Sequence, residues 1–330
     1  MSRLKILIWH IHGSYLNTLA RVDHDWYLPV KEDRPEGYGG RGWTFDLPAN
    51  LHEIPAAQVR EHDFDVVVLQ TPRTLHEDPP ALLGPEQRRL PLLDLEHNVP
   101  RPHAANTRHP FADAPTPGLL VHVTPFNRLM WDNGGLPTRV IEHSVAIDPE
   151  IAYDGRMPRG ITVVNGMQHR PRIAGYDLFL HARGHIPLDA VGMETEAFGG
   201  LGDIPYRTLH RLTARYRFLY SPMRYTSLPL AVVEAMTIGM PVVALATTAL
   251  PDVIQDGVNG FVSADPETLI ARMKTIIVDP DLAREIGERG RATARERFSL
   301  DRFRADWDDA LHAAIALGTG VISSSAGASR

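Results

Sequence analysis

The segment 221–243 carries the residue pattern best suited to bind a charged ligand. Pro229 precedes a run of apolar residues that ends at Gly239, and we predict that Pro229 is the first residue of a helix. The backbone N–H groups of Leu230 and Ala231 would lie in its first turn, with the positive end of the helix dipole. Such a helix start predicts an anion site, suited to a phosphate or diphosphate.

One acidic residue, Glu234, interrupts the apolar sequence of the same predicted helix. A carboxylate in apolar surroundings is expected to accept hydrogen bonds from a specific partner, such as the hydroxyl groups of a ribose. The alternative is that Glu234 faces solvent. We also expect Thr226 or Ser227 to cap the helix through its hydroxyl group.

The amino-terminal half contributes candidates at the ends of predicted strands. Gly13 follows the first strand, where its N–H group is expected in a strand-to-helix turn that faces a ligand, although an ordinary tight turn explains the glycine as well. His97 follows the predicted strand 90–95 and is placed to contact a bound sugar or acceptor. His103 and His109 compete for this role, and each alone is expected at the surface.

Short apolar runs alternate with helical patterns, which is typical of doubly wound α/β domains with parallel sheets. Strands are predicted at 4–9, 65–70, 90–95, 118–124, 139–142, 161–165, 188–192, 218–220 and 241–246. Asp265-Pro266 and Asp279-Pro280 predict two helix starts, each with a capping Asp and a Pro at the first helical position. A last amphipathic helix is expected at 300–317.

The stretch 152–159 has turn residues and no periodicity, so we place an interdomain linker there. Two Rossmann-like domains are therefore predicted, at 1–153 and 154–299. The small, polar tail 318–330 is expected to be disordered. Folds of this kind bind ligands beyond the carboxyl ends of their strands, so a cleft between the two domains is the expected site.

Composition excludes several classes of protein. The 330 residues are 43% hydrophobic and 22% charged, as in ordinary globular proteins, and the net charge of −6 argues against nucleic-acid binding. Without cysteine there is no disulfide or thiolate metal site. No apolar run is long enough for a membrane span, and no signal peptide is recognised. HExxH and an early GxGxxG are both missing, so neither a metal site nor a dinucleotide cofactor is predicted.

The segment 221–261 resembles the donor-binding signature of retaining glycosyltransferases of family 4 (glycosyl transferases group 1), which have the GT-B fold. The family pattern reads Glu-x-Phe-Gly-Leu-x-x-x-Glu-Ala-Met, followed by Gly-x-Pro-Val-Val. The residues that match in register are Leu230, Glu234, Ala235, Met236, Gly239 and 241–243. The first Glu of the pattern falls on Thr226 and its Gly on Pro229. These departures remove a charged sugar contact and one phosphate-binding N–H group.

The resemblance implies a cytoplasmic enzyme that transfers a sugar, with retention and without a metal or other cofactor. The donor would be a nucleotide-diphosphate-sugar, and the acceptor a small molecule, a glycan or a lipid-linked molecule. Helix 300–317 would return to the amino-terminal domain, and the acceptor would enter past the loops 37–42 and 101–117. The implied roles are diphosphate binding by Arg170, Arg172, Leu230, Ala231 and Gly13, ribose binding by Glu234, sugar contacts by Thr226, Ser227 and Leu228, and catalysis by His97 and Thr226.

Other interpretations stay open at this point. Arg170 and Arg172 lie beside the family's basic positions and not on them, so both can be ordinary solvated loop residues. A GT-B nucleotide-sugar epimerase would need no acceptor but would need paired acid and base groups in the cleft. A non-catalytic nucleotide-sugar binding protein is favoured by the loss of the family's first acid at Thr226.

Overall fold

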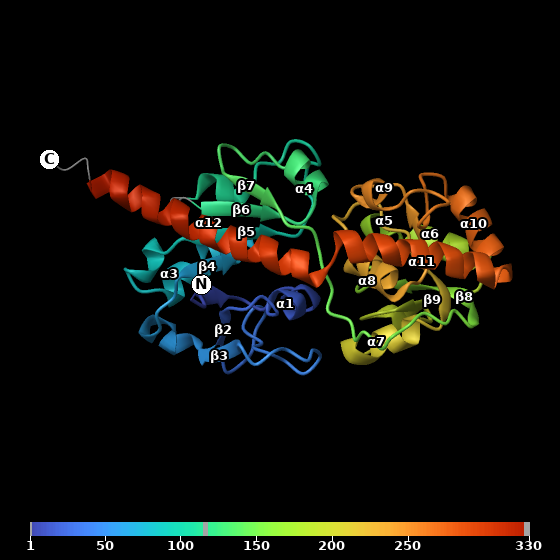
Figure 1. Ribbon diagram of the computed structural model, residues 1–330, viewed down its shortest axis with the longest axis horizontal. Helices are drawn as coiled ribbons and strands as arrows, with labels where there is room; N and C mark the ends of the chain where they lie inside the picture. Colours follow the sequence, from blue (N-terminus) through green and yellow to red (C-terminus); the bar gives the residue numbers. More distant parts are fainter. Residues whose placement is uncertain (1, 115–117, 327–330) are drawn as a thin grey trace. The chain divides into compact units, whose positions relative to one another are not determined.

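The computed structural model describes residues 2–114 and 118–326, which form two compact α/β units (Figure 1). Unit 1 combines Met1–His143 with Leu300–Arg330, and unit 2 comprises Ser144–Ser299. Each unit has its own parallel sheet with helices packed against it, and each is described separately below.

Unit 1 contains a seven-stranded sheet in the order β3-β2-β1-β4-β5-β6-β7, with every neighbouring pair parallel. Its strands are β1 (Lys5–Ile8), β2 (Asp25–Val30), β3 (Leu51–Pro55), β4 (Val66–Leu69), β5 (Leu92–Glu96), β6 (Gly118–His122) and β7 (Thr138–Val140). Its helices are α1 (Gly13–Leu19), α2 (Pro72–His76), α3 (Asp78–Leu82), α4 (Pro125–Met130) and α12 (Leu300–Ala326), with short 3-10 helices at Ala56–Glu61, Gln87–Arg89 and Pro110–Asp113.

Unit 2 contains a five-stranded sheet in the order β12-β11-β10-β8-β9, also parallel throughout. Its strands are β8 (Met157–Val163), β9 (Leu188–Val191), β10 (Tyr216–Ser221), β11 (Val242–Leu245) and β12 (Phe261–Ser263). Its helices are α5 (Pro171–Ala174), α6 (Tyr176–Arg183), α7 (Tyr206–Thr213), α8 (Leu230–Ile238), α9 (Leu250–Val253), α10 (Pro266–Val278) and α11 (Pro280–Arg297), with a 3-10 helix at Thr195–Phe198.

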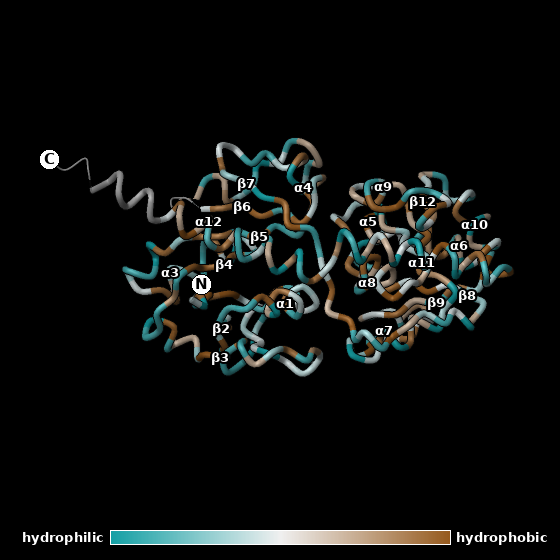
Figure 2. Tube along the Cα trace, viewed as in Figure 1, coloured by the Kyte–Doolittle hydropathy of each residue, from teal (hydrophilic) through white to brown (hydrophobic). Residues whose placement is uncertain are grey.

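The strands follow from their apolar sequences. All residues of β4 and β11 are buried, because helices cover both faces of a doubly wound sheet. Figure 2 shows such hydrophobic stretches inside both units. In the helices of unit 2, Asp265 and Asp279 accept hydrogen bonds from the first turns of α10 and α11, as predicted.

Helix α12 belongs to unit 1, where it packs on β4, β5 and β6 (Figure 1). Phe303 and Trp307 are fully buried, and the indole N–H of Trp307 donates to the Tyr15 hydroxyl at 3.1 Å. A chain segment from the far end of the sequence thus completes the core beneath α1.

The structure differs from the sequence prediction in its boundaries. The units divide between His143 and Ser144, ahead of the predicted boundary at 153. The predicted linker 152–159 packs into unit 2, where the Tyr153 hydroxyl donates to the Arg217 carbonyl at 2.8 Å and β8 begins at Met157.

The carboxyl-terminal tail also differs. The expectation of disorder over 318–330 is wrong up to Ala326, because α12 continues to that residue. Extending an existing helix costs far less than starting one, so weak helix formers can follow a well-packed first part. Residues 327–330 lie outside the described part of the chain.

Candidate functional site

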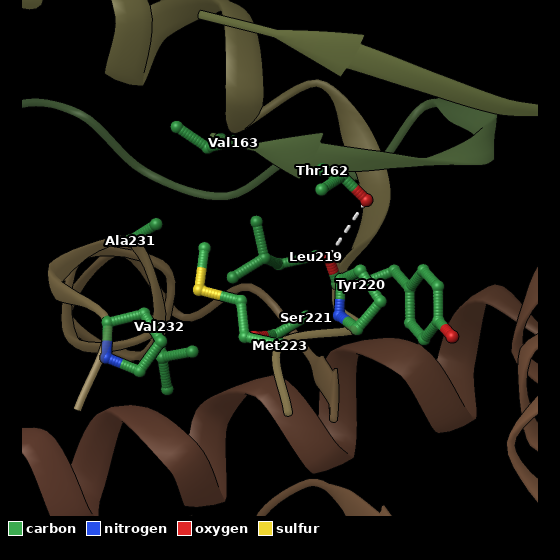
Figure 3. Close-up of a pocket in the computed structure, with 10 residues that line it drawn as sticks. Thr162, Val163, Leu219, Tyr220, Ser221, Met223, Ala231 and Val232 are labelled. Atoms are coloured by element: carbon green, nitrogen blue, oxygen red, sulfur yellow. Dashed lines mark hydrogen bonds between the residues drawn. The ribbon is translucent and has the colours of Figure 1, made fainter. Parts of the chain in front are cut away.

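In unit 2, the carboxyl ends of β8 and β10 lie beside the first turn of α8 (Figure 3). The Thr162 hydroxyl donates to the Tyr220 carbonyl at 2.9 Å and so joins the two strands. The cavity enclosed there by Ser221, Met223 and Ala231 has a volume of about 10 Å³. That is room for one water molecule, so this cavity is too small to hold a nucleotide.

Helix α8 begins one residue later than predicted. Pro229 is the N-cap, with ψ of 128°, and Leu230 is the first helical residue. Pro229 occupies the N-cap position and forms no side-chain cap hydrogen bond, so neither Thr226 nor Ser227 is the N-cap residue. The proline ring fixes the entry of the helix without a cap. The first turn at Leu230 and Ala231 is half-exposed, so its backbone N–H groups lie where a ligand can reach them.

The loop before α8 is anchored by burial and by a hydrogen bond to Thr248. Ser227 and Leu228 are buried, and the Ser227 carbonyl accepts a hydrogen bond from the Thr248 hydroxyl at 3.0 Å. Thr226 is half-exposed and reaches the surface of this loop. Of the three residues expected near the donor sugar, Thr226 is therefore the one whose side chain is open to a ligand.

Glu234 lies within α8 and is only 6% exposed, so the alternative in which it faces solvent is excluded. The Tyr206 hydroxyl donates to its Oε1 at 3.0 Å, and His210 Nε2 lies 3.4 Å from its Oε2. Both partners belong to α7. A carboxylate has about four acceptor positions, so Glu234 can still bind ligand hydroxyl groups. Sequence reasoning missed Tyr206 and His210, although their spacing of four residues places them on one helix face.

Two arginines of unit 2, Arg172 and Arg224, form a cluster around one acid, Asp177. Arg224 donates to both carboxylate oxygens of Asp177, at 2.6 and 2.8 Å, and Arg172 donates to the same carboxylate at 2.9 Å. The Arg224 guanidinium lowers the pKa of Asp177 below its usual value. Two guanidinium groups share one carboxylate, so the cluster keeps a positive charge.

Arg224 was not among the predicted residues, although it lies inside the signature segment. It also donates to the Arg172 carbonyl at 3.1 Å, and so ties the loop after β10 to α5. Of the predicted pair, Arg172 is 76% exposed and available to an anion. Arg170 donates to the Asn165 carbonyl at 2.8 Å and braces its own loop.

In unit 1, Gly13 is the first residue of α1, as predicted for a strand-to-helix turn. A Cβ atom at this position would clash with the Phe45 ring. Close packing therefore explains the glycine without a ligand.

His97 follows β5, as predicted, and lies among aromatic side chains. Its ring is 4.2 Å from the ring of His12 and 4.6 Å from that of Tyr15. Burial, together with the imidazoles of His12 and His143, holds the pKa of His97 well below 6.5, so the ring is neutral at physiological pH.

The tautomer of His97 follows from its partner. Gln70 Nε2 donates to the Trp9 carbonyl at 2.8 Å, which leaves Gln70 Oε1 to face His97 Nε2 at 3.3 Å. An amide oxygen accepts only, so Nε2 of His97 carries the proton and Nδ1 is an acceptor.

The expectation for His109 is wrong, whereas His103 is exposed as expected. His109 is 2% exposed, its Nε2 lies 3.1 Å from Glu96 Oε2, and its ring packs against Trp131 at 4.8 Å. The polar sequence around it predicted a surface loop, but this segment folds back onto β5. Residues 115–117 of the predicted loop lie outside the described residues.

The described residues contain neither a metal-binding cluster nor a membrane-spanning helix. Over residues 2–114 and 118–326, no cluster of three or more His, Asp or Glu side chains is arranged to hold a metal ion. No helix in the same ranges has the length and apolar character needed to cross a bilayer.

Two parallel α/β units of this kind define the GT-B fold, as predicted, and solved structures with that fold cover nearly the whole chain. Sucrose-phosphate synthase from Thermosynechococcus elongatus has a TM-score of 0.69 at 14% identity, covering 95% of this chain and 100% of its own. HepE from Anabaena, solved with UDP and glucose, has a TM-score of 0.69 at 16% identity, covering 94% and 100%. AviGT4, a glycosyltransferase of avilamycin A biosynthesis, has a TM-score of 0.62 at 15% identity, covering 95% and 98%.

The sequence itself gives a narrower match. Residues 196–293 match the model of the family "Glycosyl transferases group 1", which confirms the resemblance to that group across α7, α8 and the elements up to α11. No curated protein matches the chain. The matched region contains Glu234 and both of its α7 partners.

Proposed function

We propose that the protein is a glycosyltransferase that takes a sugar from a nucleoside diphosphate donor bound by unit 2. The observation that carries this proposal is the buried Glu234 carboxylate in a helix whose half-exposed first turn follows Pro229. The two features lie in one helix, within the region that matches the glycosyltransferase family. The backbone N–H groups at a helix start can bind a diphosphate, and a carboxylate can accept hydrogen bonds from the hydroxyl groups of a ribose.

In this proposal the Leu230 and Ala231 N–H groups bind the diphosphate, and the cluster of Arg172 and Arg224 adds positive charge. During transfer, the bond between the sugar and the diphosphate breaks and an acceptor hydroxyl forms the new glycosidic bond. Positive groups at the diphosphate stabilise the charge that it gains as it leaves. We further propose that the anomeric configuration is retained and that no metal is needed, so that EDTA leaves the rate unchanged.

Glu234 is proposed to bind the ribose, Thr226 the sugar, and His97 the acceptor side of the reaction. UDP-glucose is the first donor to test, since HepE was solved with it. An epimerase would convert the donor without an acceptor, and a binding protein would bind UDP-glucose without releasing UDP. Product analysis by NMR separates these outcomes from transfer.

The decisive experiment is calorimetry with UDP on Glu234→Gln and Glu234→Ala. Loss of hydrogen bonds to a charged group should weaken UDP binding by roughly 10- to 100-fold in Glu234→Ala. The matched control is Glu296→Ala, which removes an exposed acid of α11 and should bind as the wild type does. Glu234→Gln keeps the side chain's shape, which separates a binding defect from a folding defect. Unchanged UDP affinity in both Glu234 variants would refute the assignment.

A further inference from the structure

Unit 1 contains a cavity of about 370 Å³ that none of the roles above uses. It opens beyond the carboxyl ends of β4 and β5, and the segment 98–110 and Trp131 close its other sides. The volume is within the range of small-molecule sites. The cavity lies entirely within unit 1, so it can be considered without unit 2.

The unusual group in this cavity is Asp94. It is 6% exposed and lines the cavity, but in the described part of the chain no other side chain bonds to it. Only the backbone N–H of its neighbour Leu95 is in range. A buried carboxylate without donors is costly unless something supplies them. Its open acceptor positions therefore face the cavity, where a bound molecule can supply donors in place of water.

The neighbouring acid has a different environment. Glu96 is two residues further along β5, so its side chain lies on the same face of the sheet as that of Asp94. Glu96 Oε2 lies 3.1 Å from His109 Nε2, and its Oε1 accepts the backbone N–H of Asn98 at 2.5 Å. His109 is thus engaged by Glu96 and forms no hydrogen bond with Asp94, on which it acts only through its charge.

The lining of the cavity also contains hydrogen-bond donors. Arg101 lines it, is exposed, and forms no ion pair or hydrogen bond with any of the described residues. Arg108 also lines the cavity but is paired with Asp113 and Asp132. Apolar walls come from Trp131, Val99 and Leu75.

The charges of the lining restrict the ligand. Two carboxylates, Asp94 and Glu96, stand against two guanidinium groups, Arg101 and Arg108. An anion such as a phosphate would approach the buried carboxylates, and a cation would approach the arginines. A neutral molecule avoids the repulsion between like charges in both cases. Its hydroxyl groups can donate to Asp94 and accept from Arg101, while its C–H surface packs on Trp131.

We propose that this cavity binds a neutral, polyhydroxylated ring, with Asp94 as the group that accepts its hydroxyl hydrogen bonds. The role of this ring as the acceptor of the transferred sugar depends on the function proposed above, but its binding does not. The acceptor class is thereby narrowed to a sugar or cyclitol without charge at the bound ring.

The test is an NMR titration of the full chain with methyl glycosides of glucose, galactose, mannose and N-acetylglucosamine, and with myo-inositol. Glucose 6-phosphate and glucosamine are the charged probes. At least one neutral ring should bind in the millimolar range, more tightly than its charged counterpart. In titrations at pH 8, where Asp94 is charged, Asp94→Asn should weaken this binding by about 10-fold or more, because a hydrogen bond to a charged group is lost.

The matched control is Asp63→Asn, which changes an exposed acid of the same unit and should bind as the wild type does. Melting temperatures establish that both variants are folded. The proposal is overturned if no neutral ring binds, if a charged probe binds more tightly, or if Asp94→Asn binds equally well.

UDP titrations of the same proteins distinguish the two proposals. UDP binding without ring binding would remove this inference alone. Ring binding without UDP binding would remove the proposed function and leave the cavity as a ring-binding site.

Discussion

Glu234 in unit 2 and Asp94 in unit 1 are both buried carboxylates with a buried histidine nearby, but their environments differ. In unit 2, α7 supplies Tyr206 and His210 to Glu234, so the acid is held in place. In unit 1, Glu96 takes His109, and Asp94 is left with open acceptor positions. The comparison shows that a second acid nearby can decide whether a buried carboxylate is positioned by the protein or left for a ligand.

The largest expected effect on stability concerns Asp94. Burial raises the pKa of Asp94 to about 7. The charge of His109 opposes this increase, and the negative charge of Glu96 adds to it. Between about pH 4 and pH 7, Asp94 is protonated in the folded protein, whereas in the unfolded chain it has released its proton. The free energy of unfolding should therefore fall as pH rises through this window and stay lower above it.

Urea unfolding of wild type and Asp94→Asn at pH 5 and pH 8 measures this effect. From pH 5 to pH 8, the free energy of unfolding of the variant should increase relative to that of the wild type by on the order of 2–4 kcal/mol, because asparagine does not ionise. Glu96 and His109 remain in both proteins, so their own titration largely cancels. A difference between the proteins that does not change with pH would show that Asp94 is compensated as Glu234 is.

An intermediate effect is expected for Arg224→Ala. Asp177 would then neutralise Arg172, so the cluster would lose its excess charge and UDP binding should weaken by roughly 3- to 10-fold. Calorimetry checks this against Arg295→Ala, which removes an exposed arginine of α11. Equal affinity in the two variants would mean that the cluster serves only to hold the loop after β10.

The smallest effect is expected for Tyr206→Phe, which tests whether Tyr206 holds the Glu234 carboxylate in position. Loss of its hydrogen bond to Glu234 should lower the free energy of unfolding by about 1 kcal/mol. UDP affinity should change less than in Glu234→Ala, since the carboxylate remains. Chemical denaturation and calorimetry provide both readouts. A UDP defect as large as that of Glu234→Ala would show that Tyr206 itself contacts the nucleotide.

Much of the fold could be predicted because it rests on local signals. The apolar strands of both sheets and the Asp-Pro starts of α10 and α11 follow from neighbouring residues. Strands β2 and β3 were missed because they contain Pro29 and Pro55, which normally argue against a strand. Their pairing with β1 and with each other overrides that preference.

The candidate sites could be predicted only in part. The signature around α8 indicated Glu234, and the strand end at β5 indicated His97. Arg224 was missed because its role depends on Asp177, which is distant in sequence. His109 was misplaced because its local sequence is polar, whereas its burial depends on Glu96 and Trp131.

By itself, the sequence determined the alternation of strands and helices and the family-like segment around Glu234, because these depend on residues a few positions apart. The tertiary structure decided which charged groups are paired. Tyr206 and His210 reach Glu234 from another helix, whereas His109 pairs with Glu96, and Asp94 has no side-chain hydrogen bond with any residue that the structure describes. The physical reason is that burial and pairing free energies depend on distances in space, which parallel strands and packed helices create between residues far apart in the chain.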